Sequence, residues 1–188
     1  MADDKLLKNI RACSLCKEHL PLDPRPILSF SAQARVMITG QAPGIKAHES
    51  NTPWNDASGN RLREWLGISK KEFYDSKKIA IVPMGFCYPG KGKSGDLPPR
   101  QECSEKWMER IQDHLKNVKF HILIGSYAIK YFLEEDDLTQ TVKNWKKYFP
   151  EVIPLPHPSP RNNIWLKKNS WFEDDLVPVL QKAIQEKI

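Results

Sequence analysis

The sequence has no hydrophobic run long enough to cross a membrane and no apolar leader after its start, Met1-Ala2-Asp3-Asp4-Lys5. We therefore expect neither a membrane-spanning nor a secreted protein, and a cytoplasmic location is the default. The chain also has no internal repeat and no low-complexity tract. The remaining pattern, 188 residues with 40% hydrophobic and 28% charged side chains, is typical of one soluble globular domain.

Acidic residues are in the minority, because 29 Lys and Arg outnumber 23 Asp and Glu and give a formal net charge of +6 at pH 7. A basic chain of this kind is compatible with a nucleic-acid partner. A solvated, lysine-rich surface would give the same total, so the charge alone does not decide between the two.

Short apolar segments alternate with segments of helical periodicity. Strands are expected at 35–39, 79–84, 120–124 and 152–156. The segment 45–58 is expected to be a loop. The expected helices are 5–12, 60–67, a short one near Phe73, one with its N-cap at Ser104, one after Gly125, 139–149 and 173–186.

This alternation predicts an α/β fold, a three-layer α/β/α sandwich with a central, mostly parallel four-stranded sheet. Residues 1–188 are expected to form a single domain, with residues 1–34 as an N-terminal arm that carries two of the four cysteines. The carboxyl ends of parallel strands meet at one edge of a sheet, where ligands bind. One composite site is therefore expected there, built mainly from the loops after the first, second and fourth strands.

The loop after the first strand is Gly40-Gln41-Ala42-Pro43-Gly44. Two glycines around a proline force a sharp turn and allow the backbone to come close to a ligand. Backbone N–H groups in such a turn can receive an anionic or carbonyl oxygen. The alternative is a tight β-to-α turn that binds nothing.

The four cysteines form one C-x-x-C pair, Cys13 and Cys16, and a second pair, Cys87 and Cys103, 16 positions apart. In an intracellular chain they are not expected to form disulfides. Thiolates at this spacing can hold a [4Fe–4S] cluster or a zinc ion, and either would tie the N-terminal arm to the second-strand loop. Four ordinary buried or surface thiols are the remaining alternative.

The 40–44 turn, the segment PHPSPRN at 156–162 and the cysteine spacing together resemble the uracil-DNA glycosylase superfamily, and within it the iron–sulfur, thermophile-type family 4 branch. The resemblance covers about Cys13 to about Trp171. It implies a monofunctional DNA glycosylase, a hydrolase of base excision repair that flips a deaminated base out of damaged DNA, hydrolyses its N-glycosidic bond and leaves an abasic site. It also implies a structural [4Fe–4S] cluster, with zinc as the alternative metal.

The resemblance assigns catalytic roles to His157 and Gln41. A neutral His157 would donate a hydrogen bond to the oxygen of the departing base, and Gln41 would meet the base and position water. In the substrate-binding set, Trp54 would stack on the flipped base, whereas Ser159 would hold a phosphate. Arg161 or Asn162 would enter the minor groove. The set implied by the two motifs is Gly40, Ala42, Pro43, Gly44, Trp54, Ser159, Arg161 and Asn162.

Two positions bear on the substrate and the water. Ala42 stands where some branches carry a general-base carboxylate, although family 4 also has alanine there. Pro83 falls at or near an asparagine that recognises uracil in family 4. Uracil is therefore the first expected substrate base and hypoxanthine the second. Recognition of the base could instead come from Asn51, Asn55 or backbone groups. A group that activates the water could be His48, Glu49 or Asp56.

The rival prediction is a weak or inactive module of the same fold that binds nucleic acid or a modified base. A triphosphate site is not expected, because the segment 88–95 lacks the G-x4-G-K-[ST] spacing. Lys91 and Lys93 in that segment are candidates for DNA backbone contacts. A monomer is expected, while the sequence leaves open the preference for single or double strands.

Overall fold

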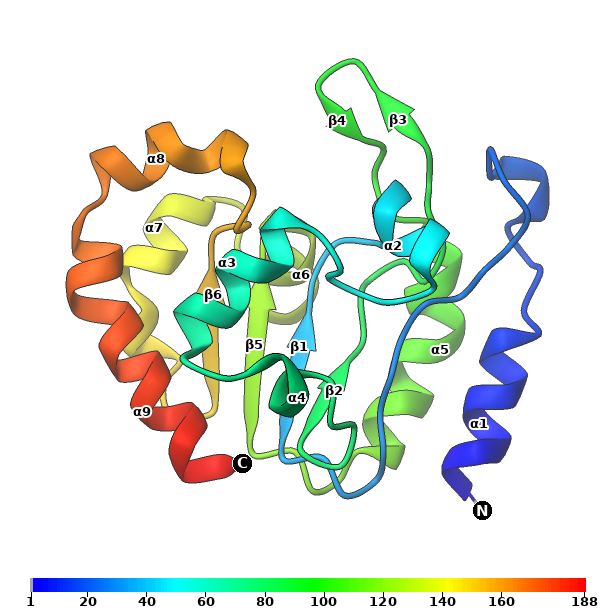
Figure 1. Cartoon of the computed structure of the whole chain (residues 1–188), viewed down its shortest axis with the longest axis horizontal. Coiled ribbons are helices and arrows are strands. Elements are labelled where there is room, and N and C mark those ends of the chain that lie inside the picture. Colours follow the sequence, from blue (N-terminus) through cyan, green and yellow to red (C-terminus); the bar gives the residue numbers. More distant parts are fainter. Residues whose placement is uncertain (1) are drawn as a thin grey trace.

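The computed structural model describes residues 2–188, and their side chains from residue 5 onward. Its centre is a sheet with strand order β2-β1-β5-β6 (Figure 1). All three neighbouring pairs run parallel. The predicted four-stranded sheet is confirmed and is parallel throughout. Its strands are β1 Val36–Thr39, β2 Ile79–Ile81, β5 Phe120–Ile124 and β6 Val152–Leu155.

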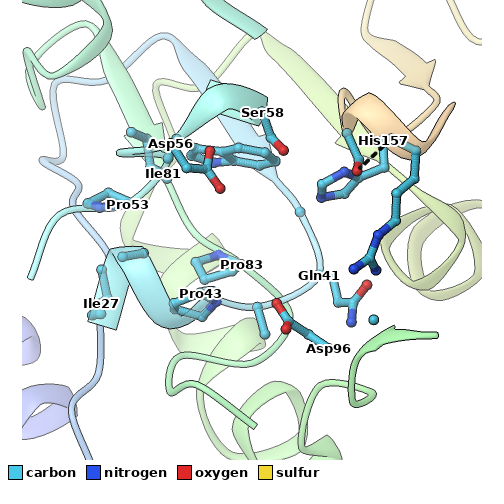
Figure 2. Close-up of a pocket in the computed structure, with 18 of the residues that line it drawn as sticks. Ile27, Gln41, Pro43, Pro53, Asp56, Ser58, Ile81, Pro83, Asp96 and His157 are labelled. Atoms are coloured by element: carbon cyan, nitrogen blue, oxygen red, sulfur yellow. Dashed lines mark hydrogen bonds between the residues drawn. The ribbon is translucent and has the colours of Figure 1, made fainter. Parts of the chain in front are cut away.

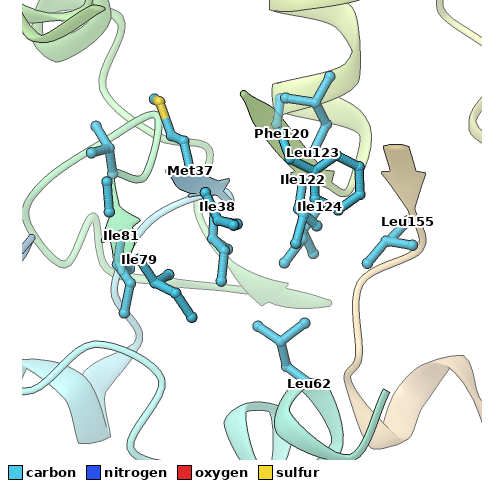
Figure 3. Packing of buried hydrophobic residues seen from close by; sticks show 14 of the residues in the cluster. Met37, Ile38, Leu62, Ile79, Ile81, Phe120, Ile122, Leu123, Ile124 and Leu155 are labelled. Carbon is cyan, nitrogen blue, oxygen red and sulfur yellow. The ribbon is translucent and has the colours of Figure 1, made fainter. Parts of the chain in front are cut away.

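The strands form where the sequence is apolar and rich in β-branched residues, because both faces of the sheet are covered. Every residue of β1 and β2 is buried. Side chains from all four strands belong to one core cluster with Leu62 of the overlying helix α3, Ala57–Leu66 (Figure 3). Strand β2 ends three residues earlier than expected, because Pro83 has no N–H to continue the ladder.

Helices cover both faces of the sheet, which gives the predicted three layers (Figure 1). On one face, helix α3 packs against the C-terminal segment, where the ring centroids of Trp65 and Phe172 are 4.8 Å apart. Helices α5, α6 and α7 follow β2 and β5 on the other face, as right-handed crossovers require. The helices are α1 Ala2–Arg11, α2 Ile45–Ser50, α3 Ala57–Leu66, α4 Lys70–Phe73, α5 Gln101–His114, α6 Ser126–Leu133, α7 Leu138–Lys143, α8 Asn163–Lys168 and α9 Val177–Lys187.

Several expected boundaries were wrong. The segment 45–58 is not a loop, since it contains α2 and the start of α3, and six residues are too few for α2 to show a clear helical period. Ser104 is not an N-cap, because α5 begins at Gln101 and the Ser104 hydroxyl donates to the Gln101 carbonyl at 2.9 Å inside the helix. The expected helix 173–186 begins with a π-helical turn, Phe172–Leu176, before α9.

Two further elements were not anticipated. Helix α8 follows the His157 loop, and the glycine-rich segment 85–100 contains a small antiparallel hairpin of β3 Lys91–Gly92 and β4 Gly95–Asp96 (Figure 1). The hairpin rises above the carboxyl edge of the main sheet. It therefore places residues 91–96 beside the loops that follow the strands.

The segment after α1 runs along the edge strand β2. Ser29 and Ile81 exchange two backbone hydrogen bonds, of 3.0 and 2.7 Å, and the Ile27 N–H donates to the Phe86 carbonyl at 2.7 Å. This contact covers the open edge of the sheet. Among the described helices, none has the length and apolar character needed to cross a bilayer.

Candidate active site

A pocket of about 430 Å³ lies at the carboxyl edge of the sheet (Figure 2). Its walls come from the loops after β1, β2 and β6, the three loops expected to build a composite site. The turn after β5 does not line it. The lining residues are Ile27, Gly40, Gln41, Ala42, Pro43, Gly44, Ala47, Pro53, Trp54, Asp56, Ser58, Ile81, Pro83, Ser94, Gly95, Asp96, His157, Ser159, Arg161 and Asn162.

The 40–44 turn forms one wall of this pocket. The Gly40 and Gln41 carbonyls accept hydrogen bonds from the N–H groups of Met84 and Gly85, each at 2.9 Å, so the turn is fastened to the loop after β2. The side-chain nitrogen of Gln41 donates to the Leu97 carbonyl at 3.0 Å. That amide nitrogen is thus engaged by the hairpin segment, and the Gln41 oxygen remains available to the pocket.

Trp54 and His157 face each other in the pocket. Their ring centroids are 5.6 Å apart, with 34° between the ring planes. The indole also lies directly over Gly40, where a Cβ would stand 2.8 Å from its Cζ2 atom. Trp54 itself adopts a left-handed backbone conformation with φ of 56°, which is unusual for a bulky residue and is held in place by its surroundings.

The support for Trp54 comes from Arg63, which is 9% exposed. Its guanidinium donates to the Trp54 carbonyl at 3.3 Å and to the Asn60 side chain at 2.6 Å. It also lies 5.2 Å from the centre of the Phe73 ring. The hydroxyl of Tyr74 donates to the Pro53 carbonyl at 2.8 Å. Trp54, which forms the aromatic wall of the pocket, is therefore held in place by a buried guanidinium and, through Pro53, by a tyrosine hydroxyl.

His157 is half-buried at the end of β6. Burial lowers the pKa of its imidazole below the ordinary 6.5, and the nearby Asp56 carboxylate only partly opposes this. The ring is therefore neutral at pH 7. The Asn162 amide donates to the His157 carbonyl at 2.8 Å and holds the loop. A neutral imidazole on a braced loop suits hydrogen-bond donation to an oxygen that gains negative charge.

Arg161 connects the His157 loop to the hairpin. Its guanidinium donates to the Ser94 carbonyl at 2.9 Å. Gly95 makes room for this contact, because a Cβ there would lie 2.6 Å from the Arg161 nitrogen. On the other side, Arg61 donates to the Ser159 carbonyl at 3.2 Å. Ser159 and Arg161 thus take part in bonds that fix the loop, and their suggested contacts with DNA remain predictions.

A family model for the uracil DNA glycosylase superfamily matches residues 29–181 of this chain. The chain belongs to that superfamily. Proteins of the superfamily act on DNA and generally hydrolyse N-glycosidic bonds. A DNA glycosylase-type function therefore agrees with the pocket found at the carboxyl edge of the sheet.

Within this superfamily fold, the pocket contains a carboxylate that sequence reasoning missed. Asp96 ends the hairpin and projects into the pocket beside Pro43, and its Oδ2 atom lies 3.2 Å from the position a Gly44 Cβ would take (Figure 2). Partial burial raises the pKa of its carboxyl above the ordinary 3.8. No local pattern could indicate Asp96, because the hairpin that carries it there was itself not predicted.

Other sequence candidates lie outside the pocket lining. Asn51, Asn55 and Glu49 are exposed and do not line it. His48 is 9% exposed, and its Nδ1 atom is buried without a hydrogen-bond partner. Pro83 does line the pocket, so a proline surface stands where the resemblance would place an amide.

The four cysteines are free thiols that lie near one another. Each of Cys16, Cys87 and Cys103 is influenced electrostatically by other members of the set, and a Cys103 hydrogen bond acts on Cys16. Burial raises the pKa of Cys87 to about 11 and that of Cys103 to about 12. Among the described side chains, no three Cys, His, Asp or Glu residues form a group that could bind one metal ion.

Proposed function

We propose that this protein is a monofunctional DNA glycosylase that hydrolytically releases a deaminated base, uracil in the first place and hypoxanthine as the alternative, and leaves an abasic site. The observation that carries this proposal is the pairing of Trp54 with a neutral His157 in one pocket. An aromatic face can stack on a flipped base, while an imidazole beside it can stabilise the charge on the departing base.

The chemistry follows from the transition state. As the glycosidic bond breaks, its electron pair moves onto the base and much of the charge collects on a carbonyl oxygen of the base. A hydrogen bond from neutral His157 strengthens as that charge develops, and such a donor contributes roughly 10²- to 10³-fold to the rate. The sugar cation is stabilised mainly by phosphates of the DNA itself. No lysine acts as a Schiff-base nucleophile in this proposal, so the DNA strand is not cleaved.

The proposed DNA interface surrounds this pocket. Ser159 would bind a phosphate, and Arg161 or Asn162 would occupy the space that the flipped base vacates. Lys91 and Lys93 lie on the hairpin beside the opening and would contact the backbone. Arg161 can reach the space of the flipped base only after its hydrogen bond to the Ser94 carbonyl is broken.

The four thiols also support a structural [4Fe–4S] cluster held by Cys13, Cys16, Cys87 and Cys103. The donors come from the N-terminal segment, the loop after β2 and, for Cys103, the start of α5, which a cluster would join. Zinc, with sulfurs at about 2.3 Å from one ion, is the alternative metal. We favour the cluster because the cysteine spacing resembles the cluster frame of the family 4 branch. Its role is to brace the fold.

The cysteine spacing and Ala42 support placement in the family 4 branch, whereas Pro83 departs from it. The same departure favours a second candidate function, a module that binds damaged DNA without releasing the base. Pro83 offers no amide to the edge of uracil, and no carboxylate follows Gln41. Tight binding without chemistry would be the signature of that module.

The deciding experiment is single-turnover base release with protein in excess over oligonucleotides that carry one uracil or one hypoxanthine. We expect release by the wild-type protein and a loss of at least about 100-fold in His157→Ala. His114→Ala, which changes a histidine on α5, is the matched control and should retain the wild-type rate. If neither oligonucleotide releases its base while DNA binding is intact, the protein is a binding module and the glycosylase proposal is wrong.

A further inference from the structure

The pocket has a second acidic side chain that the superfamily motifs do not supply, and it enters from the hairpin. We propose that Asp96 is the general base of the reaction and accepts the proton of the attacking water. This inference rests on the proposed glycosylase function. It fills the role left open by Ala42, at a position 54 residues further along the chain.

The hairpin holds Asp96 in place through two contacts with the motif loops. Arg161 from the His157 loop binds the carbonyl of Ser94, two residues before Asp96. Gln41 from the 40–44 turn binds the carbonyl of Leu97, the next residue. Asp96 therefore lies between Ser94 and Leu97, whose carbonyls accept hydrogen bonds from the loops that form the pocket.

The space for the carboxylate depends on Gly44. A Cβ at residue 44 would lie 3.2 Å from Oδ2 of Asp96, closer than most side-chain contacts. The described residues form no hydrogen bond or ion pair with this carboxylate that would occupy its oxygens. The residue is also exposed enough for water to reach it. Its lone pairs are thus free to accept a hydrogen bond from a water molecule inside the pocket.

The other carboxylate in the pocket, Asp56, is already engaged. Its Oδ1 atom accepts the Gly59 N–H at 2.8 Å as the N-cap of α3. Figure 2 shows the two carboxylates entering the pocket from different sides, Asp56 beside Ser58 and Asp96 beside Pro43. The geometry therefore gives Asp56 a capping role and leaves Asp96 for the water.

Electrostatics support this assignment. Partial burial and the charge of Asp56 raise the pKa of Asp96, whereas Arg161 and Lys91 lower it. The pKa of Tyr88 is raised mainly by desolvation and in part by the charge of Asp96. The net effect raises the pKa of Asp96, which makes its carboxylate a stronger base than that of an ordinary aspartate.

The proposed step is balanced in atoms and electrons. The C1′–N bond breaks first and its electron pair leaves with the base, and the water oxygen then forms a bond to C1′ of the resulting sugar cation. One proton of the water passes to Asp96, and His157 donates its hydrogen bond to the oxygen of the departing base. Asp96 then returns the proton to solvent, so the enzyme is regenerated.

The test measures single-turnover base release over a range of pH for wild type, Asp96→Asn and Asp56→Asn. Asparagine keeps the shape of Asp96 but cannot accept the proton, so we expect a loss of about 100-fold or more. The wild-type rate should fall at low pH as Asp96 becomes protonated, and this acid limb should be absent in Asp96→Asn. Added formate should partly restore release by Asp96→Ala.

Binding to DNA with a non-hydrolysable 2′-fluoro nucleotide separates chemistry from folding, and Asp96→Asn should bind it within about threefold of wild type. The inference is overturned if Asp96→Asn releases base at the wild-type rate, or if the acid limb disappears in Asp56→Asn instead. In both cases the glycosylase function itself stands. A wild-type protein that releases no base overturns the function and this inference together.

Discussion

The indole of Trp54 occupies the space that a side chain on Gly40 would need, since a Cβ at residue 40 would lie 2.8 Å from Cζ2 of the ring. Gly40 directly follows β1, one of the two inner strands of the main sheet, and Trp54 comes from the segment between α2 and α3. The close packing places an aromatic face above the 40–44 turn and opposite His157. Residue 40 must therefore be a glycine, because the absence of a side chain lets the Trp54 ring approach the turn.

Gly40→Ala should displace the Trp54 ring without unfolding the protein, because residue 40 has no positive φ to forbid alanine. We expect base release to slow by at least about tenfold, equivalent to about 1.4 kcal/mol of transition-state stabilisation. A double-mutant cycle provides the control, since Gly40→Ala should have little further effect once Trp54→Ala has removed the ring. Additive losses in the two variants would contradict this mechanism.

Arg63→Lys should loosen the aromatic wall. A lysine cannot donate to both Trp54 and Asn60 with the fixed geometry of the guanidinium, nor stack in the same way on Phe73. We expect the free energy of unfolding to fall by about 1–3 kcal/mol, together with slower base release. Denaturant unfolding and single-turnover kinetics measure the two effects. Arg110→Lys, an exposed arginine over the Trp107 ring, should change neither.

Loss of the proposed cluster should release the N-terminal segment. Cys16→Ser or Cys103→Ser should remove the visible iron–sulfur absorbance and lower the iron content from roughly four atoms per chain. Protease should then cut the connector 20–26 faster than in wild type. Ser14→Ala leaves all four thiols in place and should keep the iron. A colourless protein with one zinc atom per chain would contradict the iron–sulfur proposal and show that the four thiols bind zinc.

Stability should decrease on acidification through His121. This histidine is half-buried beside Thr39, with 2.8 Å between its Nε2 atom and the threonine hydroxyl oxygen, and desolvation lowers its pKa from 6.5 to about 3. Between these two values the unfolded chain binds a proton that the native protein does not. The free energy of unfolding therefore falls as the pH falls, by up to about 1.4 kcal/mol per pH unit.

His121→Gln keeps a polar group near Thr39 but does not titrate. Denaturant unfolding between pH 7 and pH 5 should show a shallower decrease for this variant than for wild type. The part of the decrease that remains should include His157, whose pKa burial also lowers. Equal slopes in the two proteins would show that His121 takes up no proton on unfolding in this range.

The larger architecture could be predicted because it depends on local patterns. Apolar, β-branched runs mark the four strands, and their alternation with helices requires a parallel sheet whose carboxyl ends share one edge. The meeting of the 40–44 turn with the His157 loop follows from this rule. Helix α2 and the hairpin were missed because each is too short for a period to be visible, and tertiary contacts hold them in place.

Local patterns and motifs were enough to predict the parallel sheet, the loops that form the pocket and the presence of Gln41, Trp54 and His157 in it. Which further side chains join them depends on how distant segments pack together. Asp96 enters because Arg161 and Gln41 fasten the hairpin over the 40–44 turn, and Arg63 fixes Trp54 from behind. Periodicity records which residues are buried on their own element, whereas contacts between distant loops depend on packing that no local pattern encodes.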